Sequence, residues 1–285
     1  MDLNVLITGA SSGIGRAIAL KLHQEGYRVL GTSRNPEKLK EDLPYEMLPL
    51  DVTSQPSVEN CIKLLFQKIH KLDVLINNAG FAHMGCAEEM SEEEARFQME
   101  TNFWGYVRMS QAVLPYMRQQ RSGKIIQISS LGGSIGIPMQ AFYAASKHAV
   151  DGYTKSLRME VRPFNVKVVL LKPGFIRTDM HASFRYAKKE MSEYREVREN
   201  VSQEISESLQ KGDSVKKVAD KVFRILRKQH PAIYYSIGTS GKLLPMLYSL
   251  FPRLFEFGSM KKFGLDKSNN HPPAGIHLNA DLLKK

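Results

Sequence analysis

The residues best suited to acid–base chemistry are a tyrosine and a lysine four positions apart, Tyr143 and Lys147, in the segment YAASK. On a helix this spacing puts both side chains on one face, so the ammonium lies within reach of the phenol. A free tyrosine has a pKa of about 10, and nearby positive charge favours the phenolate. The pair therefore predicts a general acid or base. Taken alone, YAASK could equally be a small-residue helix packed on a sheet, with a surface lysine.

A second chemical feature is a glycine-rich turn between an apolar strand, residues 5–7, and a helix that begins at Arg16. Glycines permit a tight turn and let a pyrophosphate approach backbone N–H groups at the helix N-terminus, where the helix dipole favours negative charge. The turn predicts a dinucleotide site, although an ordinary strand-to-helix turn is the alternative. Its residues are Thr8, Gly9, Ala10, Ser11, Ser12, Gly13, Ile14 and Gly15.

The elements that must position these residues alternate between apolar runs and segments of helical periodicity, with short connections between them. This alternation predicts an α/β fold, a Rossmann-like, doubly wound parallel sheet with helices on both faces. Ser91 followed by Glu94 has capping-box spacing, and Pro56 suits a first helical turn. The expected strands are 5–8, 27–32, 72–77, 123–129 and 166–172, and the expected helices include 16–25, 58–70, 91–118 and 142–162.

We expect a single domain over residues 1–265, since 285 residues suit one large core better than two. Residues 180–212 are rich in charge, with apolar positions at helical intervals, and predict a helical lid. A helix near 215–228 and a strand at 232–237 follow. The apolar segment 243–265 could close the pocket, form a subunit contact or lie on a membrane surface, and we favour the first two. Residues 266–285 are expected to be a loose tail.

Composition narrows the function classes. The net charge of +11 is spread along the chain without a long basic run or a nucleic-acid-binding motif, so a solvated surface is favoured and nucleic acid is not an expected partner. Cys61 and Cys86 lack metal-ligand spacing, and no metal site is expected. No segment has the pattern of a leader or of a membrane span. We expect a cytoplasmic protein, with peripheral membrane association as an alternative.

Further motifs follow the glycine turn in a fixed order. The turn reads TGxxxGxG, Asn77-Asn78-Ala79-Gly80 follows an apolar strand, Asn102 lies in a helical segment, and Ser130 follows the strand IIQIS. YxxxK comes next, and Pro173-Gly174 with Thr178 gives PGxxxT. Over residues 3–180 the chain resembles the short-chain dehydrogenase/reductase family, including members that act on lipids, retinoids or steroids. Ordered motifs together are far more specific than any one of them.

The resemblance implies a catalytic tetrad of Asn102, Ser130, Tyr143 and Lys147. Tyr143 would be the general acid or base, and Ser130 would orient the carbonyl, with Ser129 as its rival. Lys147 would bind ribose hydroxyls, and Asn102 would hold a water chain to solvent. The implied cofactor-binding residues are Gly9, Ser11, Ser12, Gly13, Ile14, Gly15, Ser33, Arg34, Asp51, Val52, Asn78, Ala79, Gly80, Tyr143, Lys147, Pro173, Gly174, Ile176 and Thr178.

The choice of cofactor depends on the end of the second strand, YRVLGTSRN. An acidic residue there binds the ribose 2′-hydroxyl of NAD, whereas an arginine accommodates the 2′-phosphate of NADP. Ser33 and Arg34 stand in this place, so NADP(H) is favoured and NAD(H) is possible. Arg34 could also be a solvated loop arginine. Asp51 matches the family's contact to adenine, but it could equally cap a turn.

The resemblance places the substrate pocket after Ser130, around the tyrosine and after Pro-Gly. The residues there are mostly apolar, which suits a hydrophobic carbonyl. His181 could touch the substrate or be a partly exposed polar residue. The predicted pocket residues are Ile137, Phe142, Phe175, Met180 and His181, with Ile135, Pro138 and Met139 nearby.

These inferences predict an NADP(H)-dependent oxidoreductase that interconverts a hydrophobic aldehyde or ketone, lipid-like, retinoid-like or steroid-like, and its alcohol. Two alternatives use the same fold, a catalytically idle NADP(H)-binding regulatory protein and a lyase or epimerase. The resemblance also implies a homodimer or homotetramer, with helices 91–118 and 142–162 as an interface.

Overall fold

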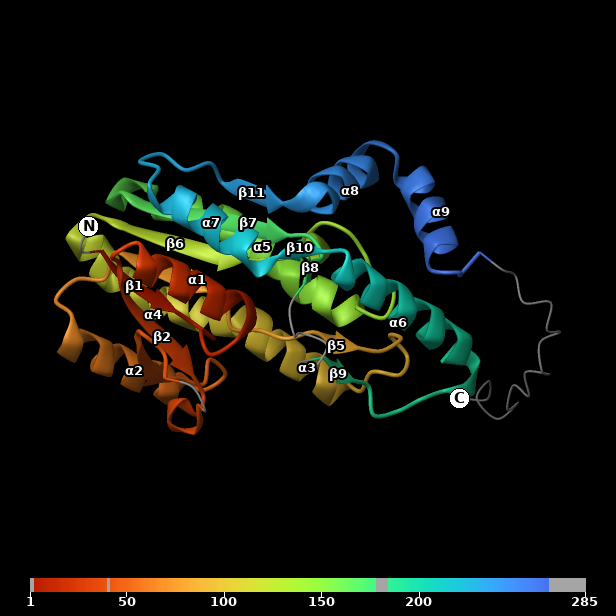
Figure 1. Ribbon diagram of the computed structural model, residues 1–285, viewed down its shortest axis with the longest axis horizontal. Coiled ribbons are helices and arrows are strands. Elements are labelled where there is room, and N and C mark those ends of the chain that lie inside the picture. Colours follow the sequence, from red (N-terminus) through yellow and green to blue (C-terminus); the bar gives the residue numbers. More distant parts are fainter. Residues whose placement is uncertain (1–2, 40–41, 178–183, 267–285) are drawn as a thin grey trace, which may run out of the picture.

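A computed structural model describes residues 3–39, 42–177 and 184–266. Its centre is a seven-stranded sheet in the order β11-β7-β6-β4-β1-β2-β3, in which every pairing is parallel (Figure 1). The predicted doubly wound α/β fold is therefore confirmed. The strands are β1 (Asn4–Ile7), β2 (Arg28–Ser33), β3 (Glu46–Pro49), β4 (Val74–Asn77), β6 (Gly123–Ile128), β7 (Val166–Pro173) and β11 (Tyr234–Ile237).

Helices cover both faces of this sheet (Figure 1). On one face Val5 and Ile7 of β1 pack in a core with residues of α1 and α7, while Leu6 points to the other face, where α2, α4 and α5 pack. A strand buried on both faces is apolar throughout, which explains the uninterrupted run at residues 5–7. The helices are α1 (Gly13–Gln24), α2 (Gln55–Lys68), α4 (Gly105–Gln120), α5 (Ala141–Glu160) and α7 (Val215–Leu226).

Both predicted helix starts are present. The Ser91 hydroxyl accepts from the Glu94 backbone N–H (3.2 Å) and the Glu94 carboxylate accepts from the Ser91 N–H (2.9 Å), which completes a capping box at α3 (Glu92–Met99). Ser54 caps α2, with Pro56 in its first turn. The single helix predicted over 91–118 is interrupted, because a π-helical turn at Glu100–Trp104 separates α3 from α4.

The remaining elements lie at the carboxyl ends of the sheet strands and beyond β11. Two pairs of short strands, which the sequence did not predict, connect distant segments: β5 (His83–Met84) with β9 (Arg185–Tyr186), and β8 (Ile176–Arg177) with β10 (Asp213–Ser214). The described part of the predicted lid contains α6 (Arg195–Gln210). The apolar C-terminal segment forms α8 (Gly238–Leu250) and α9 (Pro252–Lys262). Among the described residues no helix has the length and hydropathy to cross a bilayer.

Candidate active site

A cavity of about 690 Å³ lies at the carboxyl ends of β1, β4, β6 and β7. The strand order reverses between β1 and β4, the place where open α/β sheets bind ligands. Most of the predicted cofactor and catalytic residues meet in this cavity. Those that line it are Gly9, Ser11, Ser12, Gly13, Ile14, Ser33, Arg34, Asp51, Val52, Asn78, Ala79, Gly80, Ser130, Tyr143, Lys147, Pro173, Gly174 and Ile176.

The glycine turn is tied to the loop after β4 by side-chain hydrogen bonds. The Thr8 hydroxyl accepts from the N–H groups of Asn78 (2.9 Å) and Ala79 (3.0 Å). In return the Asn78 amide donates to the carbonyls of Thr8 (3.1 Å) and Gly9 (3.0 Å). Gly9 has a φ of +66°, and a Cβ at this position would lie 3.0 Å from the Ala79 Cα. A side chain at Gly9 would therefore be strained and would push the two loops apart.

Gly15 is the last glycine of the turn. It is buried and is not among the residues that line the cavity. A Cβ at Gly15 would lie 2.1 Å from the Gly9 carbonyl oxygen and 2.5 Å from the Asn78 amide nitrogen. Gly15 therefore lets the helix pack closely against the glycine turn and Asn78. Its assignment to the cofactor site stays a prediction.

The N-terminus of α1 opens into the cavity. Ser12 is the N-cap residue, yet its side chain makes no capping hydrogen bond, and a Cβ on Gly13 would meet nothing within 4 Å. The first N–H groups of a helix have no partner within the helix, and they carry its positive dipole end. The N–H groups of the first helical turn and the open space next to Gly13 together fit a pyrophosphate at this end of the cavity.

The second strand ends in a polar corner of the same cavity. The Ser33 hydroxyl oxygen is buried without a hydrogen-bond partner, and Arg34 beside it is exposed and pairs with no carboxylate of the described residues. Both groups fit a phosphate oxygen. The Asp51 carboxylate accepts from the Thr53 N–H (2.9 Å) and hydroxyl (2.7 Å), so the predicted turn role is present, and Asp51 also lines the cavity.

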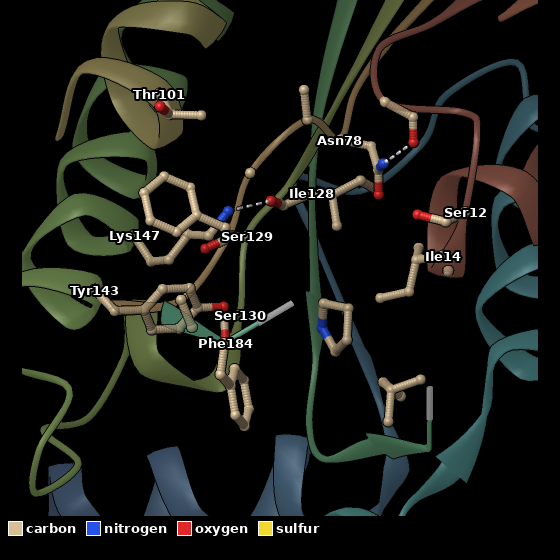
Figure 2. Close-up of a pocket in the computed structure, with 18 of the residues that line it drawn as sticks. Ser12, Ile14, Asn78, Thr101, Ile128, Ser129, Ser130, Tyr143, Lys147 and Phe184 are labelled. Atoms are coloured by element: carbon tan, nitrogen blue, oxygen red, sulfur yellow. Dashed lines mark hydrogen bonds between the residues drawn. The ribbon is translucent and has the colours of Figure 1, made fainter. Parts of the chain in front are cut away.

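Ser130, Tyr143 and Lys147 meet on the wall opposite the glycine turn (Figure 2). Tyr143 and Lys147 project from adjacent turns of α5, and the lysine Nζ lies 5.9 Å from the centroid of the tyrosine ring. The Lys147 ammonium donates to the Ile128 carbonyl (3.0 Å). Ser130 follows β6, and its hydroxyl accepts from the Gly132 N–H (3.1 Å). Figure 2 shows the Tyr143 hydroxyl turned toward Ser130.

Burial shifts the proton affinities of both ionisable groups. Burial raises the pKa of the Tyr143 phenol, and the neighbouring Ser130 hydroxyl partly offsets that rise. Burial lowers the pKa of the Lys147 ammonium to about 8, and the negative charge of Asp151 opposes this shift. At neutral pH the chain alone therefore holds a protonated phenol beside a lysine that is still mostly charged. This combination suits proton donation.

A buried polar network behind the tyrosine separates the roles of the two serines. The Ser129 hydroxyl donates to the Asp151 carboxylate (2.6 Å), and Asp151 also forms an ion pair with Lys172. Lys172 in turn donates to the Ser134 hydroxyl (2.8 Å). Because the Ser129 hydroxyl is committed to Asp151, Ser130 is the hydroxyl beside the phenol.

Asn102 lies in the π-helical turn and is fully buried, outside the lining of the cavity. Its side-chain oxygen accepts from the Phe81 N–H (3.1 Å), and its amide donates to the Phe81 carbonyl (2.9 Å) and to the Ser146 hydroxyl (3.2 Å). Asn102 thus fixes the loop after β4 against α5. Its part in a water chain stays a prediction.

The predicted substrate residues divide into three groups. Ile137 and Phe175 line the cavity. Phe142 does not, because adjacent residues of a helix point about 100° apart and Tyr143 is the one that faces the cavity, and its contact with substrate stays a prediction. Ile135, Pro138 and Met139 also lie outside the lining. Met180 and His181 fall outside the described residues, as does Thr178 of the predicted cofactor residues.

Several residues of the substrate side were missed by sequence reasoning. Ile205 and Leu209 of α6 reach the cavity, and their spacing of four within an amphipathic pattern was a usable signal. The Arg185 guanidinium lies 4.9 Å from the ring centroids of both Phe81 and Phe97. No local sequence pattern predicts this contact. The apolar lining that was not predicted comprises Phe81, Ala82, Phe97, Leu131, Phe184, Ile205 and Leu209.

No cluster of metal-ligating side chains occurs within residues 3–39, 42–177 and 184–266. Both cysteines are buried, and burial raises the pKa of the Cys61 thiol to about 12 and that of the Cys86 thiol to about 11. Neither thiol is therefore a nucleophile at neutral pH.

Comparison with known proteins agrees with this geometry. The family model described as short chain dehydrogenase matches residues 3–189, and the chain belongs to the short-chain dehydrogenase/reductase family of oxidoreductases. Among solved structures, a short-chain dehydrogenase from Streptomyces avermitilis is 30% identical, with a TM-score of 0.78 over 91% of this chain and 98% of that one.

Two further relatives bear on ligands. A 3-ketodihydrosphingosine reductase from Bacteroides thetaiotaomicron is 50% identical over 174 residues, which are 61% of this chain and 64% of that protein. The match thus spans less than two thirds of that relative's length. The structure titled ElxO with NADP bound is 29% identical, with a TM-score of 0.70 over 83% of this chain and 97% of that one.

Proposed function

We propose that the protein is an NADP(H)-dependent reductase, or dehydrogenase in the reverse direction, for a hydrophobic aldehyde or ketone. The observation that carries this proposal is the position of Ser130, Tyr143 and Lys147 on one wall of a cavity whose other end is a helix N-terminus with unpaired N–H groups. A dinucleotide spanning the cavity would therefore bring its reactive end to a proton donor.

Each side chain has a role in carbonyl reduction. Bound NADPH supplies the hydride. The Ser130 hydroxyl donates to the carbonyl oxygen and orients it, and the Tyr143 phenol gives that oxygen a proton. Lys147 binds a ribose hydroxyl, and its ammonium charge favours the phenolate that Tyr143 becomes. Asn102 holds the loop at Phe81 in place, and in this proposal it also helps to hold the water chain that restores the proton.

The preference for NADP(H) is supported by the corner at the end of β2. The Ser33 hydroxyl and the Arg34 guanidinium, which pairs with no carboxylate of the described residues, offer hydrogen bonds to a 2′-phosphate, and neither Asp nor Glu ends this strand to bind a 2′-hydroxyl. The NADP-bound relative supports the same choice.

The substrate class is supported by the lining of the other half of the cavity. Phe81, Phe184, Ile205 and Leu209 present an apolar surface next to Tyr143, which favours a carbonyl on a long or bulky apolar group. A relative named for a keto-lipid points the same way.

The test follows the absorbance of NADPH and NADH with purified protein and a panel of carbonyls. The panel contains long-chain aldehydes, retinal, ketosteroids, acyl-dihydroxyacetone phosphate and 3-ketodihydrosphingosine. We expect one class to consume NADPH and the Tyr143→Phe variant to lose about 10²–10⁴-fold of the rate. The variant should still bind NADPH, because Phe keeps the ring and removes only the hydroxyl.

The remaining outcomes separate the alternatives. Tight NADPH binding without turnover of any carbonyl would indicate an idle cofactor-binding protein. Conversion of a substrate without net NADPH consumption would indicate a lyase or epimerase. Equal rates in the Tyr143→Phe variant would contradict the proposed proton donor.

A further inference from the structure

The last two helices present large apolar side chains to solvent. Of the thirteen large hydrophobic residues that are exposed in the described part of the chain, eight lie between Leu243 and Met260. Leu250, Leu254 and Phe257 are 62%, 63% and 62% exposed. In α8 only Gly241 is buried, and in α9 no residue is. Contiguous exposed apolar surface of this kind marks an interaction site.

These helices form a hairpin, residues 238–262, that is attached to the domain at both ends. The rings of Tyr248 and Phe255 meet edge to face, with centroids 5.4 Å apart, so α8 and α9 pack on each other. Figure 1 shows both helices beyond β11, outside the layers that cover the sheet. At the far end Phe263 is buried in the cluster that contains Ile205 of α6. The hairpin is therefore held in place, and its apolar side faces outward.

The charge of the hairpin is positive. Lys242, Arg253 and Lys261 are exposed and pair with no carboxylate of the described residues. Glu256 is the only acidic residue between positions 238 and 262. Apolar side chains flanked by unpaired cations match the surface of an anionic bilayer, where burial among acyl chains and attraction to headgroups reinforce each other.

The same features disfavour the other two roles predicted for this segment, closure of the cavity and contact with a second copy of the chain. No described residue from 243 onward lines the cavity, so the hairpin does not close it. A second copy docked through the same surface would bring the same excess of cations from both chains to one interface, with only Glu256 from each chain to offset them. A chain with a net charge of +11 adds further repulsion between copies.

We propose that the α8–α9 hairpin is a docking surface for an anionic lipid bilayer. It lies in the headgroup plane and does not span the membrane, since the two helices have 13 and 11 residues. Through Phe263 the hairpin also touches the cluster of Ile205 and Leu209, both of which line the cavity. Docking thus brings the apolar wall of the cavity close to the bilayer. The proposal does not depend on the reductase activity.

The experiment sediments the full-length chain with vesicles of phosphatidylcholine alone and of phosphatidylcholine mixed with phosphatidylglycerol. We expect binding to the anionic vesicles only, weakened by high salt. The Leu250→Glu/Leu254→Glu/Phe257→Glu variant should lose it. The matched control is Met159→Glu, which changes an equally exposed apolar residue (70%) on α5 and should bind like the native chain.

A second variant tests the charges separately. Lys242→Gln/Arg253→Gln/Lys261→Gln keeps the apolar surface, and each lost charge should weaken binding to anionic vesicles roughly fivefold. NADPH binding reports that both variants are folded. Because all these positions are exposed, we expect the affinity for NADPH to be unchanged in both variants.

Three results would overturn the proposal. They are no binding of the native chain to anionic vesicles, equal binding to both vesicle types, and a loss in the Met159→Glu control equal to that in the triple variant. Light scattering adds a further check. A native dimer that the apolar triple variant converts to a monomer, without vesicle binding, would assign the hairpin to a second copy of the chain instead.

Discussion

The two halves of the active-site cavity are built in different ways. The half that we assign to the nucleotide is made largely of backbone, shaped by Gly9 and Gly13 and held by the Thr8 and Asn78 hydrogen bonds. The half that we assign to the substrate is made of side chains brought from distant segments, such as Phe81 after β4 and Leu209 in α6. Changes in the first half should therefore affect every substrate alike, whereas changes in the second should depend on the substrate.

The largest effect should come from the residue that serves both halves. Lys147→Met keeps an apolar chain of similar length but removes the charge beside Tyr143 and the donor to Ile128. We expect kcat/KM to fall about 10³-fold for every carbonyl, and NADPH affinity to fall as well. Steady-state kinetics and NADPH fluorescence titration measure these changes. Lys155→Met, an exposed lysine of the same helix, is the control, and an equal loss there would refute the assignment.

A change at the nucleotide corner should alter cofactor choice and leave substrate choice intact. Arg34→Ala removes the guanidinium available to a 2′-phosphate, and a hydrogen bond to a charged group contributes about 1.5–3 kcal/mol. We expect the preference for NADPH over NADH to fall roughly 10–100-fold. Arg28→Ala, at the other end of β2, should preserve it. An unchanged preference in Arg34→Ala would mean that the arginine is merely solvated.

A change in the substrate half should give the opposite pattern. Phe184 lines the cavity next to Ser130 and Tyr143 (Figure 2), and Phe184→Ala removes apolar contact with the substrate. We expect kcat/KM for a long-chain carbonyl to fall about 10-fold, with little change for a short one or in the KM for NADPH. Tyr186→Ala, an exposed neighbour in β9, serves as control. An equal loss of kcat/KM for all substrates would contradict the proposal that the two halves of the cavity have different roles.

The smallest effect near neutrality should be a pH dependence. Because burial lowers the pKa of Lys147 to about 8, the ammonium is lost as the pH rises through that value, while the raised pKa keeps Tyr143 protonated. We expect kcat/KM for NADPH to be level below about pH 7, about halved at pH 8 and to approach a tenfold fall per unit above pH 9. Lys147→Met should lack this inflection. A level native profile up to pH 9.5 would contradict the role of the lysine.

The succession of strands and helices along the chain, and most of the residues assigned to the nucleotide half, could be predicted because their signals are local. The run at residues 5–7, the turn at Gly9–Gly15 and the Ser91–Glu94 box each specify a backbone conformation through neighbouring residues. Gly15 shows the limit of such local signals. The motif fixes where the glycine lies in the chain, but only the packed turn shows that its missing side chain makes room for the Gly9 carbonyl.

The sequence by itself determined a parallel sheet with helices on both faces, a dinucleotide turn, and a tyrosine and lysine on one helical face. The tertiary structure alone decided that Ser129 is committed to Asp151, that Asn102 holds the Phe81 backbone, and that Arg185 lies over two phenylalanine rings. It also left the apolar residues of α8 and α9 on the surface. The physical reason is the range of the interactions. Turns and helix faces depend on residues a few positions apart, whereas these contacts join segments that meet only when the chain has folded.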